Sequence, residues 1–203
     1  MSQTINHLFQ AAQADGTLSD DAVNVLNIAD IGQEIQTALG VCVDDVHASE
    51  VMLLTMMPDD SGSIRFAGNS QAVRDGHNIV LDALISSRQE DTILVHTRYL
   101  NGDILFPYTP IVNAVKMDRR NYNPNRGTPL FDQTIVLLGT VLAKSQEFAE
   151  NGVYVRTATL IITDGDDQHS TKANPGKVKT VVDSMLAMED HLIYAMGIDD
   201  GQT

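Results

Sequence analysis

The sequence contains little cysteine and few basic residues. Cys42 is the one cysteine among 203 residues, which excludes an internal disulfide and a zinc site built from several cysteines. Lysine and arginine total 13 against 27 aspartate and glutamate residues, for a formal net charge of −14. Such a chain is repelled by nucleic-acid phosphates and by anionic membrane surfaces. We therefore expect neither nucleic acid nor a membrane among its partners.

Long apolar runs are also missing. No stretch approaches the ~20 apolar residues that a membrane span requires, and the first residues, MSQTINHLFQAAQADG, lack the basic and unbroken apolar regions of a signal peptide. Neither GxxxxGK[ST] nor GxGxxG occurs, so the common phosphate-binding loops are not indicated. With a hydrophobic content of 43%, the chain is expected to fold around a sizeable core as a cytoplasmic protein.

The first 45 residues have apolar side chains at helical spacing and predict an N-terminal helical extension. One segment covers Ile5 to Ala12 and a second runs from Ala22 to Leu39. Gly16 is placed to end the first helix and Ser19 to cap the second. We expect these two helices to form a hairpin.

From residue 50 onward, short apolar runs alternate with helical stretches. Buried strands are predicted at 51–57, 156–165 and 191–198, and a β-hairpin at 92–111 in which Pro107 confines the second strand to a sheet edge. Helices are predicted at 70–88, 129–152 and 177–190. This order indicates a doubly wound α/β fold, with a mostly parallel open sheet, helices on both faces and one antiparallel edge hairpin.

Oxygen-bearing side chains follow two of the predicted strands. Asp59, Ser61 and Ser63 come after the first strand, and Asp164 comes after the strand residues TLIIT at 159–163. Thr128 stands before a helix that has Pro129 in its first turn. If the strands at 51–57 and 156–165 are neighbours, these loops converge at the carboxyl edge of the sheet. Carboxylates and hydroxyls without nitrogen or sulfur suit Mg²⁺ or Mn²⁺, and the residues leave the choice between the two ions open.

These motifs resemble the metal-ion-dependent adhesion site of the von Willebrand factor type A domains. The family pattern is Asp-x-Ser-x-Ser, a distant Thr, and an Asp that commonly stands in Thr-Asp-Gly. The resemblance covers about residues 50–200 and implies one Rossmann-like domain at 46–203. It implies that Ser61 and Ser63 bind the metal directly and Thr128 directly or through water. Asp59 and Asp164 would then act largely through water. The remaining coordination position would be filled by a Glu or Asp of a partner.

The resemblance implies an intracellular, prokaryotic, metal-dependent protein-interaction module and not an enzyme. Two other functions stay open. A metal-assisted phosphohydrolase or phosphotransferase could use Asp59 as its nucleophile, or the chain could be a scaffold that interacts through its N-terminal helices. The sequence names no partner and indicates no oligomeric state.

Some features lie outside the family pattern. Family members usually continue with one more helix and strand beyond 191–198, so we expect either a shortened domain or a chain cut at its end. The loop at 116–126 is basic, and it is either simply solvated or adds positive charge where an acidic partner docks. His169 is expected on the solvated rim of the site. The other central histidines are expected to be packed or on the surface: His77, His96 and His191.

Overall fold

A five-stranded sheet forms the centre of the protein. The computed structural model describes residues 2–28, 31–87, 92–165 and 167–198. The strands are β1 (Glu50–Pro58), β2 (Ile93–Arg98), β3 (Ile104–Pro110), β4 (Tyr154–Thr163) and β5 (His191–Gly197), and their order is β3-β2-β1-β4-β5. β1 pairs in parallel with β2 and β4, and β5 pairs in parallel with β4. The predicted α/β class with a mostly parallel sheet is therefore confirmed.

The antiparallel hairpin lies at one edge of this sheet. β3 pairs with β2 in the antiparallel sense, and the register shifts between Val95 and Arg98. Pro107 lies in β3, where the missing backbone N–H is tolerated because β3 is the outer strand of the sheet. The hairpin was thus predicted correctly from the proline and the short NGD turn.

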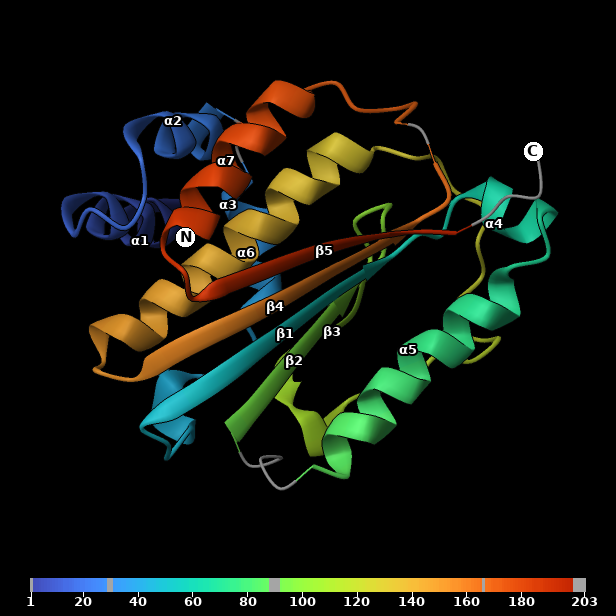
Figure 1. The fold of residues 1–203 in the computed structure, drawn as a ribbon, viewed down its shortest axis with the longest axis horizontal. Helices are drawn as coiled ribbons and strands as arrows, with labels where there is room; N and C mark the ends of the chain where they lie inside the picture. The colour runs from blue at the N-terminus through green and yellow to red at the C-terminus, as the bar shows by residue number, and fades with distance from the viewer. Residues whose placement is uncertain (1, 29–30, 88–91, 166, 199–203) are drawn as a thin grey trace.

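Helices cover both faces of the sheet (Figure 1). α5 (Ser70–Ile85) packs on one face, where Leu81 contacts a cluster that includes Leu54 and Met56 of β1. α6 (Leu130–Glu150) and α7 (Pro175–Ala187) lie on the opposite face. Three short elements were not predicted: α4 (Gly62–Phe66) and the 3-10 turns η1 (Val43–Asp45) and η3 (Ile111–Asn113).

The N-terminal region contains three helices and not the expected hairpin of two. They are α1 (Ser2–Ala14), α2 (Asp20–Ile28) and α3 (Gly32–Ala38). Gly16 has a φ of +74° after α1, and Ser19 Oγ accepts the Ala22 N–H at 3.3 Å, so both predicted boundaries are present. The expected single helix over 22–39 is wrong because α2 ends at Ile28 and Ile31 lies outside helical structure.

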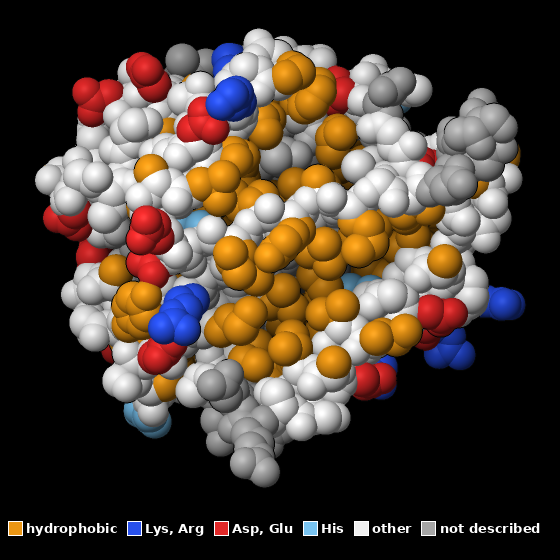
Figure 2. Space-filling view, in the orientation of Figure 1, with side chains coloured by type: hydrophobic (Ala, Val, Ile, Leu, Met, Phe, Trp, Pro, Cys, Tyr) orange, Lys and Arg blue, Asp and Glu red, His pale blue; other side chains and the backbone are white. Residues whose placement is uncertain are grey.

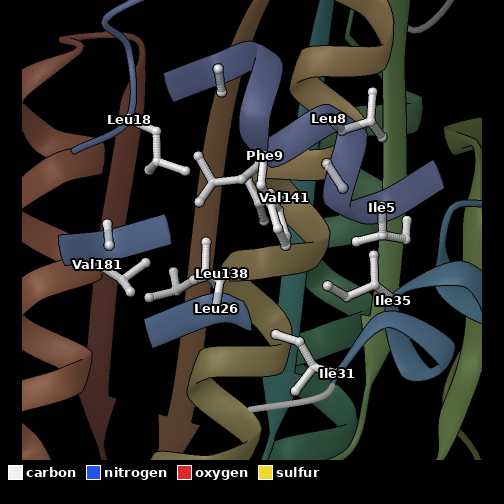
Figure 3. Close-up of a cluster of buried hydrophobic side chains, with 14 of the residues drawn as sticks. Ile5, Leu8, Phe9, Leu18, Leu26, Ile31, Ile35, Leu138, Val141 and Val181 are labelled. Atoms are coloured by element: carbon white, nitrogen blue, oxygen red, sulfur yellow. The ribbon is translucent and has the colours of Figure 1, made fainter. Parts of the chain in front are cut away.

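These helices share one hydrophobic core with α6 and α7 (Figure 3). Phe9 of α1, Leu26 of α2 and Ile35 of α3 pack with Leu138 of α6 and Val181 of α7, and all five are at most 2% exposed. Gly139 of α6 lies under this contact, since a Cβ there would stand 3.0 Å from the Ile31 and Ile35 side chains. The N-terminal helices are therefore built into the layer that covers one face of the sheet.

One strip of the opposite sheet face is not covered by a helix of the described chain. Leu192, Tyr194 and Met196 of β5 alternate along the strand and are 54%, 57% and 54% exposed. Figure 2 shows hydrophobic side chains running over the strands between α7 and α5. β5 is also the outer strand, so one of its backbone edges is open in the described structure. Among the described residues, no helix is both long and apolar enough to cross a membrane.

Candidate metal centre

Asp59 is fixed where β1 leaves the sheet. Its backbone N–H donates to the Ile162 carbonyl at 2.8 Å, which continues the pairing of β1 with β4 for one more residue. Its side chain is fully buried: Oδ1 accepts the Ser61 N–H and Oδ2 accepts the Thr163 hydroxyl, each at 2.7 Å. The carboxylate is thereby held by its own loop and by the neighbouring strand.

Ser61 and Ser63 present their hydroxyls to one another. Ser61 Oγ lies 2.8 Å from Ser63 Oγ, with Ser61 buried and Ser63 exposed. Ser61 is the N-cap of α4, and the first turn of this helix brings Ser63 back beside it; Ile64 of the same turn is fully buried and anchors it. Two hydroxyl oxygens at this spacing can serve as neighbouring ligands of one cation.

The loop that carries Thr128 is hydrogen-bonded to the Ser61 loop. The N–H groups of Asn125 and Arg126 donate to the Asp60 carbonyl at 3.0 and 3.1 Å, and the Gly62 N–H donates to the Arg126 carbonyl at 3.1 Å. Ser61 and Arg126 also form an isolated parallel bridge. Thr128 itself is 7% exposed, two residues further along.

The loop after β4 holds Thr128 from the other side. His169 Nδ1 accepts the Thr128 N–H at 2.9 Å, and the Thr128 carbonyl accepts the N–H groups of Gln168 and His169 at 3.1 and 3.3 Å. His169 was expected only as a rim residue; it is exposed, but its ring also positions Thr128. Its place five residues after Asp164 was visible in the sequence, but its partner was not.

Asp164 directly follows β4, which ends at Thr163, as predicted from the sequence. Its Oδ2 is buried. Because β4 is the neighbour of β1, and Thr163 bonds Asp59, Asp164 lies at the same carboxyl edge as the Asp59 loop. The expected meeting of three separate loops is therefore present.

The N-terminus of α6, which follows Thr128, is hydrogen-bonded to the loop after β4. Pro129 is the N-cap, and not the first helical residue as predicted. The Phe131 N–H donates to Asp167 Oδ1 at 3.2 Å and the Asp132 N–H to Ser170 Oγ at 2.9 Å, which satisfies two of the helix donors. Although burial raises the pKa of Asp132, the backbone N–H groups of residues 171–173 outweigh it and lower that pKa.

The donor set of these loops suits a hard cation. The three loops carry three hydroxyls and two carboxylates, and a partly hydrated Mg²⁺ accepts such ligands directly or through water. Among the described residues, no three His, Cys, Asp or Glu side chains gather closely enough to hold a metal. The five residues predicted for the site carry two carboxylates and three hydroxyls: Asp59, Ser61, Ser63, Thr128 and Asp164.

Asp60 was not predicted to matter, but it is one of the most unusual residues of the site. It is 4% exposed, and its side chain points away from that of Asp59 to accept the Asn101 N–H at 3.0 Å. Burial raises its pKa to about 6, and Asp59 and Asp103 add to this, while the hydrogen bond from Asn101 opposes it. This burial could not be predicted from the sequence, because Asn101 belongs to the distant β2–β3 turn.

Two tyrosines brace the Asp59–Asp60 segment. The Tyr122 hydroxyl donates to the Asp59 carbonyl, and the rings of Tyr99 and Tyr122 contact each other at a centroid distance of 5.6 Å. Burial raises the pKa of both hydroxyls. Tyr122 belongs to the basic loop at 116–126, so part of this loop is packed and not solvated.

The charges of the basic loop are partly paired. Lys116 Nζ lies 2.6 Å from Asp82, and Arg126 lies 3.7 Å from Asp103, both on the surface. Elsewhere, His77, His96 and His191 are at most 4% exposed, so the prediction of packed histidines is correct. Burial lowers the pKa of all three, to about 3 for His96 and about 4 for His191.

Comparison with known proteins adds no assignment. No family model matches the chain, and no curated protein is significantly similar to it. The function must therefore be argued from the geometry of the three loops.

Proposed function

We propose that the protein is a divalent-metal-dependent protein-interaction module. In this proposal, Mg²⁺ or Mn²⁺ is held by Ser61, Ser63 and Thr128, with Asp59 and Asp164 acting through bound water, in the manner of a von Willebrand factor type A domain. The ion supplies a coordination position that a Glu or Asp of a partner fills. The protein residues provide the oxygens and the negative charge that hold the ion.

The observation that carries the proposal is the pair of Ser61 and Ser63 hydroxyls, 2.8 Å apart, in a loop bonded to the loop before Thr128 and to the end of β4. A turn that served only to connect β1 and α5 would not need its hydroxyls to face each other beside a buried carboxylate. The net charge of −14 also favours a cation over an anion at this position.

The geometry gives less support to an enzyme that uses Asp59 as a nucleophile. Both carboxylate oxygens of Asp59 accept hydrogen bonds, and the residue is 0% exposed. A nucleophile needs an oxygen that can approach the substrate in line. Hydrolysis of p-nitrophenyl phosphate that disappears in Asp59→Asn would nevertheless favour the enzyme over the binding module.

Metal binding is tested by calorimetric titration of Mg²⁺ and Mn²⁺ into the metal-free protein. We expect saturable binding to the wild type and at least a tenfold weaker affinity in Ser61→Ala and Ser63→Ala, since each variant removes one direct ligand. Ser86→Ala is the matched control, because Ser86 lies at the end of α5 and bonds only the Asp82 carbonyl. Equal affinity in all four proteins would contradict the metal site.

Partner recognition is tested with immobilised peptides that carry Glu, Asp, Gln or Asn at one central position. Binding that requires both an acidic centre and Mg²⁺, and that EDTA abolishes, is the expected result. Binding that is the same for Glu and Gln peptides would contradict metal-bridged recognition even if the ion itself is bound.

A further inference from the structure

A polar pocket lies directly beside the candidate metal centre. Its volume is about 200 Å³. Asp60, Tyr99 and Tyr122 form its buried part, each at most 7% exposed. Its rim carries side chains from the β2–β3 turn and from residues 120–126: Asn101, Asp103, Arg120, Asn121, Asn123, Asn125 and Arg126.

The pocket shares its walls with the metal centre. Asp60 stands between Asp59 and Ser61, and its carbonyl holds the Asn125 and Arg126 N–H groups of the loop that leads to Thr128. Asp59 and Asp60 point to opposite sides of the chain, to Thr163 and to Asn101 respectively. The pocket and the metal centre therefore adjoin through the Asp59–Ser61 segment.

The size of the pocket suits one side chain. Since a water molecule takes up ~30 Å³, the pocket has room for about seven waters. This is below the 300–1,000 Å³ that is typical of sites for drug-sized ligands or cofactors. The lining is dominated by amide, hydroxyl and charged groups, so an apolar side chain would leave many of these groups without partners.

The charges of the lining leave one carboxylate without a cation. Arg126 pairs with Asp103 at 3.7 Å, and both are exposed. The Arg120 side chain is exposed beside Asp118, which accepts the Arg120 N–H at 2.7 Å. Asp60 is the most buried charged residue of the pocket, and its carboxylate accepts a hydrogen bond from the Asn101 N–H. No lysine or arginine of the described chain forms an ion pair with it.

We propose that this pocket receives a cationic side chain, an Arg or Lys, of the same partner segment whose acidic side chain binds the metal. The guanidinium or ammonium group hydrogen-bonds the Asp60 carboxylate, and the asparagine side chains at the rim accept its other N–H groups. The partner would carry an acidic and a basic residue close together, because Asp60 and Ser61 are adjacent in the chain. Only the part of this inference that concerns the acidic residue of the partner rests on the proposed function.

The cationic half is tested without metal or partner. The probes are N-acetyl-arginine methylamide and its neutral analogue N-acetyl-citrulline methylamide, titrated into ¹⁵N-labelled protein in EDTA. We expect the arginine probe to shift the amide signals of Asn101, Asn125 and Arg126, and to bind about tenfold more tightly than the citrulline probe, as for a hydrogen bond to a charged group. Equal binding of the two probes, or tighter binding of N-acetyl-glutamate methylamide, would overturn the proposal.

Asp60→Asn is the decisive variant. Asparagine keeps an oxygen for the Asn101 N–H and removes only the charge, so the fold should be retained. We expect this variant to bind the arginine and citrulline probes with about equal affinity. Asp44→Asn is the matched control, since Asp44 is exposed in η1, outside the pocket, and should keep the full preference. Retention of the preference in Asp60→Asn would also overturn the proposal.

A peptide experiment separates this inference from the proposed function. Peptides with a central Glu and an Arg or citrulline one to three positions away are compared in Mg²⁺. Tighter binding of the Arg peptides supports the pocket. Magnesium-dependent binding of Glu peptides without a preference for Arg would overturn the pocket and leave the metal-bridged module intact. If magnesium has no effect but the free arginine probe still depends on Asp60, the proposed function fails and the pocket stands.

Discussion

The Thr163 hydroxyl, at the end of β4, lies 2.7 Å from Asp59 Oδ2, at the end of β1. Besides the backbone pairing of β1 with β4, this side-chain hydrogen bond links the ends of the two strands, at the edge where Asp164 follows. The same hydroxyl accepts the Gly165 N–H at 3.3 Å, so Thr163 links the Asp59 loop to the first residues after β4. Thr163 therefore helps to position both Asp59 and the segment that carries Asp164.

Replacement of Thr163 by valine tests this link. Valine has a similar shape but cannot donate, which leaves the buried Asp59 Oδ2 without its donor. We expect a loss of about 1–3 kcal/mol in the free energy of unfolding, measured by urea denaturation in EDTA. Thr163→Ser keeps the hydroxyl and should lose less than half as much. A valine variant as stable as the serine variant would contradict this role.

His169→Ala tests whether the imidazole positions Thr128. Removal of the ring leaves the Thr128 N–H without its acceptor and loosens the loop. Because His169 is exposed, stability should change little, while the affinity for Mg²⁺ should fall about three- to tenfold, the effect of one hydrogen bond. His47→Ala, at another exposed histidine, is the control for calorimetry. Unchanged affinity in His169→Ala would show that Thr128 is positioned by other contacts.

Glu34→Gln tests the contact between α3 and the sheet. Arg98 of β2 is 0% exposed, and its Nη2 lies 3.4 Å from Glu34 and 2.8 Å from Gln133 Oε1 of α6. Because the Glu34 side chain is 42% exposed, solvent screens part of the pairing, and we expect a loss of about 1–2 kcal/mol in stability. The exposed pair of Arg156 and Glu50 is the control, where Glu50→Gln should leave the stability almost unchanged because solvent screens the pair. Equal losses would contradict a special role for Arg98.

Gly40→Ala tests a close approach of the chain to β3. Gly40 has a φ of +61°, and a Cβ there would stand 2.0 Å from the Tyr108 carbonyl oxygen. Gly16 has a φ of +74° but no atom within 4 Å of such a Cβ. We expect Gly16→Ala to lose about 1–2 kcal/mol from the left-handed backbone alone, and Gly40→Ala at least about 2 kcal/mol more. Thermal unfolding of the two variants decides this, and similar losses would contradict the structure here.

The buried histidines predict how stability depends on pH. Burial lowers the pKa of His96 to about 3 and of His191 to about 4, from 6.5. Between these values and 6.5 the unfolded chain binds more protons than the folded chain, so their contribution is complete above pH 6.5 and is lost as the pH falls. Each contributes a slope of about 1.4 kcal/mol per pH unit in this window. We expect His191→Asn to reduce the slope between pH 6 and 4.5; an unchanged slope would contradict the pKa assigned to His191.

Much of the fold could be predicted from the sequence because its signals are local. Gly16, Ser19 and Gly152 mark helix boundaries and Pro107 marks an edge strand, and the structure confirms these predictions. The break between α2 and α3 was missed because the apolar spacing continues across it. Spacing alone does not show that a helix has been interrupted.

The candidate site was predictable in part. The sequence predicted that the Asp59 loop and Asp164 would share one edge if their two strands were neighbours, and β1 and β4 are neighbours. The contacts that fix the site were not predictable, because Thr163, His169 and Asn101 act on residues 41 to 104 positions away. The burial of Asp60 was also not predictable, because no sequence pattern shows that its carboxylate contacts the β2–β3 turn.

The uncovered strip of β5 has a consequence for handling the protein. Alternating Leu192, Tyr194 and Met196 beside an open strand edge form a template on which another strand can pair. Chains with a net charge of −14 repel one another, and this repulsion opposes such pairing. Salt near 1 M shortens the range of that repulsion to about 3 Å. Concentrated stocks should therefore aggregate sooner in high salt than in low salt.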